Sequence, residues 1–134
     1  IAFNHSLKAI YMYSGSNDLS VSKQDKSPLQ ILETYKYVVK LLRSKFPNTP
    51  IYYIAISPNE RRWEVWDKIQ ETNELIKNYS SNKPNMYFVE TASALLGADG
   101  KYQPQLHIDD KLHFNEKGYE IWTKIMRKSI AEIK

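Results

Sequence analysis

Two short polar segments carry residue types suited to acid–base chemistry. Gly-Ser-Asn-Asp occupies residues 15–18, and His-Ile-Asp-Asp-Lys-Leu-His-Phe-Asn occupies residues 107–115. In the second segment, Asp110 and His113 are three residues apart, so the carboxylate can hold one imidazole nitrogen and leave the other free to take a proton. In the first segment, the side-chain amide of Asn17 can donate a hydrogen bond to an oxygen that is gaining negative charge. The two segments therefore offer a general base and an oxyanion donor.

Both segments also have purely structural interpretations. Asn17 and Asp18 follow a glycine, and Asx side chains in turns commonly bond their own backbone. Asp110 and His113 stand just before a predicted helix, where they can serve as a capping pair with Asn115 as the N-cap. Neither segment alone decides between the two interpretations.

Metal and cofactor chemistry finds little support in the composition. The second segment offers four potential metal ligands, His107, Asp109, Asp110 and His113, but their spacing matches no recognised ligand signature. The absence of cysteine excludes disulfides, thiolate metal sites and a cysteine nucleophile. We therefore expect no metal and no cofactor.

The elements that must position these segments alternate between strands and helices. Runs rich in apolar and aromatic residues predict strands at 7–13, 51–56 and 86–90. Helical spacing of apolar residues predicts helices at 27–46, 62–79 and 115–133. The order strand, helix, strand, helix, strand, helix is typical of an α/β sandwich of three layers around a parallel sheet.

Local signals refine these predictions. Ser27 as N-cap, Pro28 at the first helical position and Gln30 at the capping-box position mark the start of the first helix. The strand at 51–56 is a continuous apolar run, which predicts a central strand covered on both faces. Apolar stripes along the other two helices are expected to face the core. The stripe of the helix at 62–79 comprises Trp66, Ile69, Asn73, Ile76 and Tyr79. The stripe of the helix at 115–133 comprises Tyr119, Trp122, Ile125, Met126, Ile130 and Ile133.

A parallel sheet has a consequence for the polar segments. The loops after the three strands, 14–27, 57–62 and 91–114, should all emerge at the carboxyl edge, where such folds bind ligands. With 134 residues and 42% apolar content, the chain is long enough for one domain, 1–134, and too short for two. The polar segments of that domain should meet at one edge.

The charge and hydropathy patterns exclude other classes of protein. The net charge of +4 comes from lysines spread among acidic residues, which predicts no nucleic-acid partner. No apolar run approaches the roughly 20 residues of a membrane span. The chain begins at Ile1 without a signal-peptide pattern, so we expect a processed, trimmed or excised N-terminus, and the compartment stays open.

The combination of motifs resembles the SGNH, or GDSL-type, hydrolase family of esterases and lipases. The likeness rests on G-x-N-D at 15–18 after a strand and on D-x-L-H-F-N-x-x-G-Y at 110–119 before the last helix. Residues 50–76 also look like the family's strand and helix between these motifs, and D-G-x-Y-x-P-x-L at 99–106 looks like its approach to the catalytic histidine. The resemblance covers essentially the whole chain and implies a flavodoxin-like parallel sheet.

The resemblance implies roles for individual residues. His113 is the catalytic base, Asp110 orients it, and Asn17 is an oxyanion-hole donor. Gly15 allows the tight turn, and Asp18 braces the loop. The implied activity is hydrolysis of a small-molecule ester by a Ser-His-Asp mechanism.

The sequence departs from the family pattern at the nucleophile. The family's serine lies in a G-D-S element that precedes G-x-N-D, and this sequence contains no G-D-S. We therefore expect the C-terminal part of the fold, without its first two strands, and negligible activity of this chain alone. The edge of the strand at 7–13 should then pair with a complementing N-terminal segment or with a second copy.

Two further expectations remain open. Arg62 and Trp63 follow the second strand and are candidates for substrate contact, as is the loop around Tyr102. For the first two residues, a salt bridge at the helix start and a packed tryptophan are the favoured interpretation. The alternative to an esterase is a non-catalytic domain, a truncated hydrolase that binds a ligand or partner through the same edge.

Overall fold

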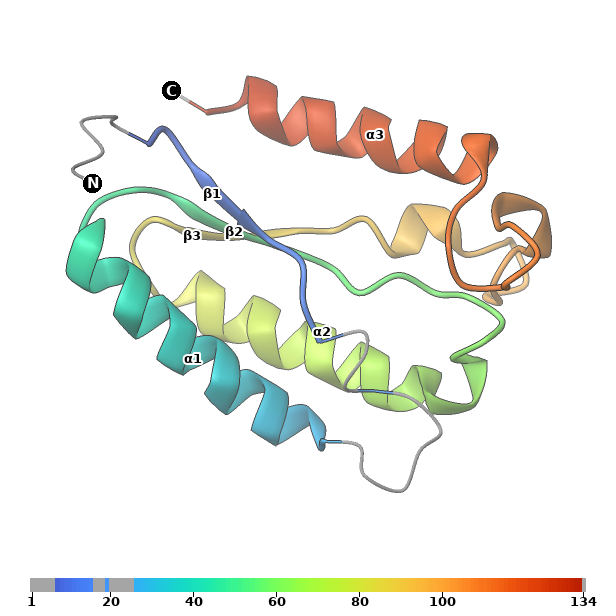
Figure 1. Ribbon diagram of the computed structural model, residues 1–134, viewed down its shortest axis with the longest axis horizontal. Helices are drawn as coiled ribbons and strands as arrows, with labels where there is room; N and C mark the ends of the chain where they lie inside the picture. The colour runs from blue at the N-terminus through green and yellow to red at the C-terminus, as the bar shows by residue number, and fades with distance from the viewer. Residues whose placement is uncertain (1–6, 16–18, 20–25, 134) are drawn as a thin grey trace.

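A parallel sheet lies between two layers of helices in the computed structural model, which describes residues 7–15, 19 and 26–133 (Figure 1). The strands of the described residues are β1 (Ile10–Met12), β2 (Ile51–Ile54) and β3 (Met86–Val89), in the sheet order β1-β2-β3. The α-helices are α1 (Pro28–Lys45), α2 (Trp66–Ser81) and α3 (Glu116–Ala131). Short 3-10 helices occupy Trp63–Val65, Ser93–Leu95 and Pro104–Leu106. The predicted three-layer α/β architecture is confirmed.

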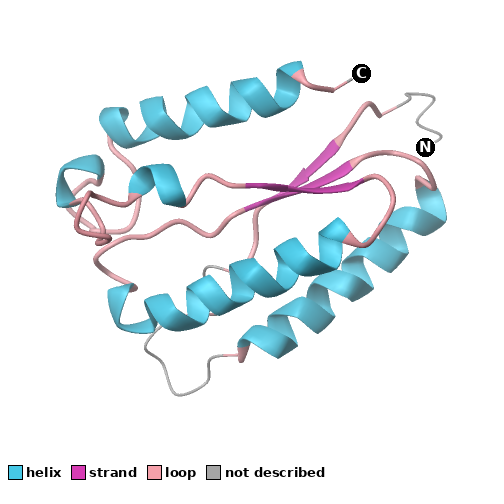
Figure 2. Cartoon of the chain, turned by 180° about the vertical axis from the view of Figure 1, so that it is seen from behind, coloured by secondary structure: helices cyan, strands magenta, loops and turns pink. Residues whose placement is uncertain are grey.

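Side chains of the central strand alternate between the two helical layers, as the two-residue period of a strand requires. Ile51 and Tyr53 belong to the core that includes α1 and α2, whereas Ile54 packs with Met126 of α3. Figure 2 shows α1 and α2 together on one face of the sheet and α3 on the other. The central position predicted for the second strand is confirmed.

Three tyrosines form a row across the sheet on the α3 side. Tyr11, Tyr52 and Tyr87 sit side by side in register, and their ring centroids are 4.6 and 4.9 Å apart. The Tyr11 hydroxyl lies 2.9 Å from Ser129 Oγ of α3. This row joins the three strands and ties the edge strand to the helix above it.

Helix starts follow the predicted capping signals closely where those signals are strong. Ser27 and Gln30 form the complete capping box of α1, and Asn115 caps α3 through Gly118 N–H. The helix predicted from residue 62 instead opens with a 3-10 turn, and α2 begins at Trp66 with no side-chain cap. Without a capping side chain, nothing local fixes where such a helix starts.

Two predictions at the edges of the fold are corrected. The first strand covers residues 10–12 rather than 7–13, and Leu7 and Tyr13 are exposed, because its register with β2 extends over three residue pairs. The predicted apolar stripe of α3 is buried only in part, since Tyr119 and Ile130 are about half exposed. Among the described residues, no helix is long and apolar enough to cross a bilayer.

Candidate active site

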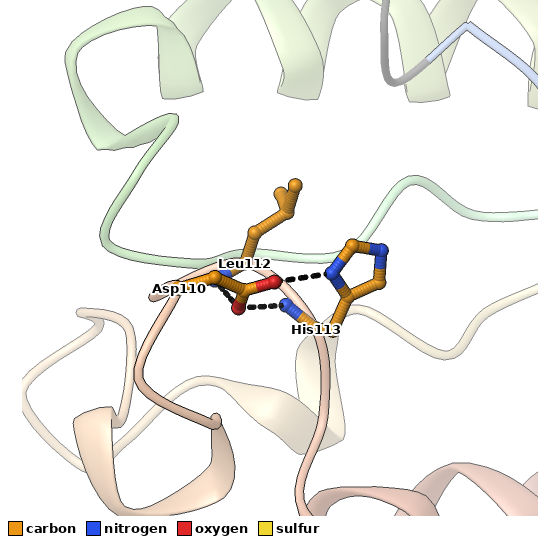
Figure 3. Close-up of polar contacts among 3 residues, drawn as sticks. All are labelled: Asp110, Leu112 and His113. Carbon is orange, nitrogen blue, oxygen red and sulfur yellow. Dashed lines mark hydrogen bonds and ion pairs between the residues drawn. The ribbon is translucent and has the colours of Figure 1, made fainter.

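Asp110 and His113 form a hydrogen-bonded pair in the loop before α3 (Figure 3). The Asp110 Oδ2 to His113 Nδ1 distance is 2.5 Å, and Asp110 Oδ1 accepts hydrogen bonds from the backbone N–H groups of Leu112 and His113 at 3.0 and 2.9 Å. The predicted contact between the carboxylate and the imidazole is therefore present. His113 is about two-thirds exposed, so the pair faces solvent.

These hydrogen bonds determine which ring nitrogen of a neutral His113 carries the proton. The bond from the imidazole, followed by those from the two backbone N–H groups, holds the pKa of Asp110 below its ordinary value. An ionised carboxylate can only accept, so Nδ1 of a neutral His113 carries the proton and Nε2 keeps its lone pair. Figure 3 shows the second ring nitrogen on the side of the ring away from Asp110. The ring is in the tautomer that a general base requires.

A tight turn holds the pair in place. Ile108 N donates to His113 O at 2.9 Å, and Lys111 N donates to Ile108 O at 3.0 Å. Lys111 has a left-handed backbone with φ of 60°, which reverses the chain within the turn. His107 and Phe114 pair as an isolated antiparallel bridge that closes it. The catalytic candidates thus lie on a small hairpin-like loop rather than on a free strand end.

The loop after β2 supports this turn from the side. Arg61 N donates to Lys111 O at 3.1 Å, and the Lys111 ammonium lies 3.3 Å from the Glu60 carboxylate. The loop after β2 is itself tied to α2, because the Asn73 side chain bonds both the N–H and the C=O of Ile56 at 2.9 and 3.0 Å. Figures 1 and 2 show the loops that follow β2 and β3 side by side at the carboxyl end of the sheet. The predicted meeting at one edge is confirmed for these two loops, and most of the third, 14–27, lies outside the described residues.

The N-terminus of α3 anchors the turn from the other side. Asn115 accepts from Gly118 N–H at 3.1 Å, and its Nδ2 donates to Gln105 O at 2.7 Å. Gly118 is buried against Leu106 O and the Phe114 side chain, where a Cβ would collide with both. The glycine therefore allows the helix to start directly against the loop that carries His113.

The predicted oxyanion segment is described only in part. Asn17 and Asp18 lie outside the described residues. Gly15 has φ of +97°, a conformation that favours glycine, which agrees with the tight turn expected there. Ser14 O, just before it, accepts a hydrogen bond of 2.5 Å from the Tyr53 hydroxyl. The flank of the predicted segment therefore lies on the α1/α2 side of the sheet, at the end of β1.

A pocket of about 250 Å³ opens beside His113. Its walls come from the end of β1, the loop after β2, the histidine loop and α3. The lining residues are Tyr13, Ser57, Asn59, Leu112, His113, Phe114, Tyr119 and Trp122. Sequence reasoning missed Ser57 and Asn59 as pocket residues, although their position directly after β2 was a usable signal.

Arg62 and Trp63 are packed into the molecule. Arg62 is buried, and Trp63 stacks on Trp66 at 5.5 Å and meets Tyr102 edge-on at 5.2 Å between ring centroids. These contacts favour the packed-tryptophan interpretation of Trp63. A role of Arg62, Trp63 or Tyr102 in substrate contact stays a prediction.

His107 differs from His113 in its surroundings. Its ring is half-buried, stacks on Phe114 at 5.5 Å between centroids, and has Nδ1 3.2 Å from Gln103 O. Burial is the main cause that lowers the pKa of His107. Within the described part of the chain, no group of three or more His, Asp or Glu side chains could hold a metal ion.

Comparison with known proteins identifies a single family. A model of the GDSL-like Lipase/Acylhydrolase family matches residues 3–121. A search of curated proteins finds no match.

Several solved structures share the fold. A protein from Streptococcus pneumonia, provisionally described as a platelet activating factor, superposes with a TM-score of 0.80 at 20% identity over 96% of this chain and 62% of its own. A carbohydrate esterase family 3 protein from Talaromyces cellulolyticus gives 0.75 at 16% identity, with coverages of 93% and 57%. A GDSL-like lipase from Bacteroides thetaiotaomicron gives 0.67 at 17% identity, with coverages of 93% and 62%. The chain thus spans about three-fifths of the length of these structures.

Proposed function

This chain belongs to the GDSL-like lipase/acylhydrolase family, and we propose that it forms the histidine-bearing part of a serine ester hydrolase. The observation that carries the proposal is the Asp110–His113 pair, in which Nδ1 is held by the carboxylate and Nε2 keeps a free lone pair. A histidine in this arrangement is suited to remove a proton from a hydroxyl group. The family supplies the reaction class, which is hydrolysis of an ester.

The proposed mechanism has two stages, acylation of a serine and hydrolysis of the acyl enzyme. A serine hydroxyl attacks the ester carbonyl while His113 Nε2 takes its proton, and Asp110 stabilises the imidazolium that forms. The oxyanion of the tetrahedral intermediate accepts a hydrogen bond from the Asn17 amide. The intermediate collapses, and His113 returns the proton to the departing alcohol. Water, deprotonated by His113, then attacks the acyl enzyme. His113 returns this proton to the serine oxygen as the acid leaves, which restores the hydroxyl.

The serine is proposed to come from a segment outside these 134 residues, because the sequence has no G-D-S element. Among the described residues β1 pairs only with β2, so its outer edge can accept a further strand. Tyr13, directly after β1, and His113 line the same pocket. A strand added parallel to β1 would bring its carboxyl end to this pocket, where the serine and the ester carbonyl would meet the imidazole.

The proposed substrate is a small-molecule ester. One of the solved structures with this fold is described as a carbohydrate esterase and another as an acetyl esterase, and both descriptions name ester cleavage. A pocket of about 250 Å³ is slightly smaller than the usual ligand site, which suits a short acyl group.

Hydrolysis of p-nitrophenyl acetate by the complete gene product tests the proposal. We expect measurable turnover, loss of at least about 1,000-fold in kcat for His113→Ala, and near wild-type turnover for the exposed control Asp109→Asn. An inert wild-type gene product, tested also with longer acyl chains, would contradict the proposal and favour the non-catalytic domain.

A further inference from the structure

We propose that Ser57 and Asn59 form a polar subsite in the pocket beside His113, and that this subsite binds an acceptor oxygen in the acyl group of the substrate. The inference rests on the proposed function and deepens it, because it names the class of acyl group: a short chain that carries an ether, hydroxyl or carbonyl oxygen. Neither the sequence motifs nor the family resemblance assigns a role to these two residues.

Both residues lie in the loop directly after β2, at the carboxyl end of the sheet. They line the same pocket of about 250 Å³ as His113, and each is only 5% exposed. Most of the remaining wall is apolar or aromatic, and it includes Phe114 and Trp122. Ser57 and Asn59 therefore place buried hydrogen-bonding groups where a ligand beside His113 can be oriented.

The hydroxyl of Ser57 has unused hydrogen-bonding capacity. Within the described part of the chain, its Oγ is buried and has no hydrogen-bond partner. An unbonded buried hydroxyl costs free energy, and native proteins keep few such groups. The same is true of the Tyr35 hydroxyl, Ser80 Oγ and His107 Nε2, but those residues do not line this pocket. A ligand in the pocket would supply the partner that the protein does not give to Ser57.

The side-chain amide of Asn59 is held in an orientation that leaves a donor available. Its Oδ1 accepts from Arg62 N–H at 3.0 Å, which identifies the other branch of the amide as Nδ2. Nδ2 donates to Ser57 O at 3.4 Å, a long contact that uses only one of its two N–H groups. The second N–H can donate to an oxygen of a ligand.

The backbone around Ser57 is fixed before a ligand binds. The Asn73 side chain bonds the N–H and the C=O of Ile56 at 2.9 and 3.0 Å. Pro58 follows Ser57 and is fully buried, and a residue before proline is restricted to extended backbone. No hydrogen bond has to break when the Ser57 side chain turns toward a ligand, because its Oγ makes none among the described residues. The subsite is thus rigid in its backbone and adjustable in its hydroxyl.

Ser57 is assigned a binding role and not that of the nucleophile. A nucleophilic serine lies within hydrogen-bond reach of its base, whereas Ser57 Oγ makes no hydrogen bond to His113. The surrounding sequence, Ile-Ser-Pro-Asn, is not a G-D-S element. Ser57 is therefore expected to influence which acyl group is preferred, without becoming acylated itself.

The first test compares two esters whose acyl chains differ at one position. p-Nitrophenyl methoxyacetate has an ether oxygen where p-nitrophenyl butyrate has a methylene group. In the complete gene product, the ratio of their kcat/KM values should fall about fivefold in Ser57→Ala and in Asn59→Asp, because each variant lacks one of the proposed donors. Comparing this ratio between variants cancels the intrinsic reactivities of the two esters and any general effect on His113.

Ser80→Ala is the matched control, because it removes another buried hydroxyl without a partner that lies near Tyr35 and not in the pocket. Its ester ratio should equal that of the wild type. The urea midpoint of Ser57→Ala should equal or exceed that of the wild type, since the removed hydroxyl has no partner to lose. A lower midpoint, or an unchanged ester ratio in either pocket variant of an active enzyme, would overturn the subsite and leave the proposed function standing.

The second test does not depend on turnover. The amides 2-methoxy-N-methylacetamide and N-methylbutanamide carry the same two acyl groups, and their binding to the complete gene product can be followed through the NMR signal of the Asn59 side-chain amide. The wild type should bind the methoxy compound about fivefold more tightly, and Ser57→Ala should bind both equally. Equal affinities in the wild type, or no binding of either amide, would overturn the subsite. A gene product that is inert toward both esters yet prefers the methoxy amide would overturn the proposed function alone.

Discussion

The two carboxylate oxygens of Asp110 have different partners. Oδ2 bonds the imidazole, whereas Oδ1 bonds two backbone N–H groups and so fixes the carboxylate plane relative to His113. The arrangement needs no distant residue, because all three partners lie within three positions along the chain. A single aspartate therefore both builds the turn and sets the tautomer of the histidine.

Asp110→Asn should separate the role of Asp110 in the turn from its role in orienting His113. The amide keeps the shape of the carboxylate but removes its charge, so the imidazolium loses its stabilising partner and the tautomer is no longer fixed. We expect kcat for p-nitrophenyl acetate to fall by about 100-fold or more in the complete gene product. Asp109→Asn is the control, since Asp109 is exposed in the same loop. Equal activities of the two variants would show that Asp110 does not orient the base.

His107 should make the native state sensitive to acid. Burial lowers the pKa of His107 in the folded protein, so the unfolded chain, with a pKa of about 6.5, binds the proton more readily. Above the unfolded pKa both states are neutral and the native state keeps its full stability. This stability is lost as pH falls through the lower pKa of His107 in the folded protein. The urea midpoint of the wild type should therefore drop between pH 7.5 and pH 5, and by less in His107→Gln. An equal drop in the urea midpoint of the wild type and of His107→Gln would show that His107 does not cause the sensitivity to acid.

The start of α3 is the element on which the histidine loop depends most. Gly118→Ala would drive a methyl group into Leu106 O and the Phe114 side chain, which are backbone and ring atoms that cannot easily give way. We expect the free energy of unfolding to fall by about 1–3 kcal/mol, measured by urea denaturation. Lys117→Ala, at the exposed neighbouring position, should leave it within about 0.5 kcal/mol. A Gly118→Ala variant as stable as the control would contradict the close approach.

The sequence predicted elements best where local side chains define them. Ser27 and Asn115 marked two helix starts correctly, because an N-cap bonds backbone groups only three residues away. The ends of β1 depended on its register with β2, and the exposure of Tyr119 and Ile130 depended on how much of α3 the sheet covers. Those properties come from partners distant in the sequence.

In the candidate site, too, contacts between residues close in the sequence were predictable and contacts between distant residues were not. The contact between Asp110 and His113 was predictable from a spacing of three residues. The hydrogen bond from Tyr53 to Ser14 joins residues 39 positions apart, and the ion pair between Glu60 and Lys111 joins residues 51 positions apart. No short sequence pattern can predict contacts at such separations. The sequence thus predicted the contact within the candidate pair, and the structure added long-range contacts of the loops at the same edge of the sheet.

The outer edge of β1, which pairs with no strand among the described residues, is a feature at the scale of the whole molecule. An edge strand with partly exposed side chains is a template for further pairing. If a serine-bearing strand normally covers it, the 134-residue chain alone should self-associate, and its mass by light scattering should rise with concentration. The complete gene product should show no such rise. A stable monomer of the 134-residue chain at all concentrations would contradict the proposed pairing.

Labelling of the complete gene product with a fluorophosphonate probe, followed by peptide mapping, tests the central claim most directly. The reagent forms a covalent bond with a serine only when a base activates it. We predict one labelled serine, located outside these 134 residues, and loss of labelling in His113→Ala. A label on a serine within this sequence, or labelling that persists without His113, would contradict the claim that His113 activates a serine brought in from another segment.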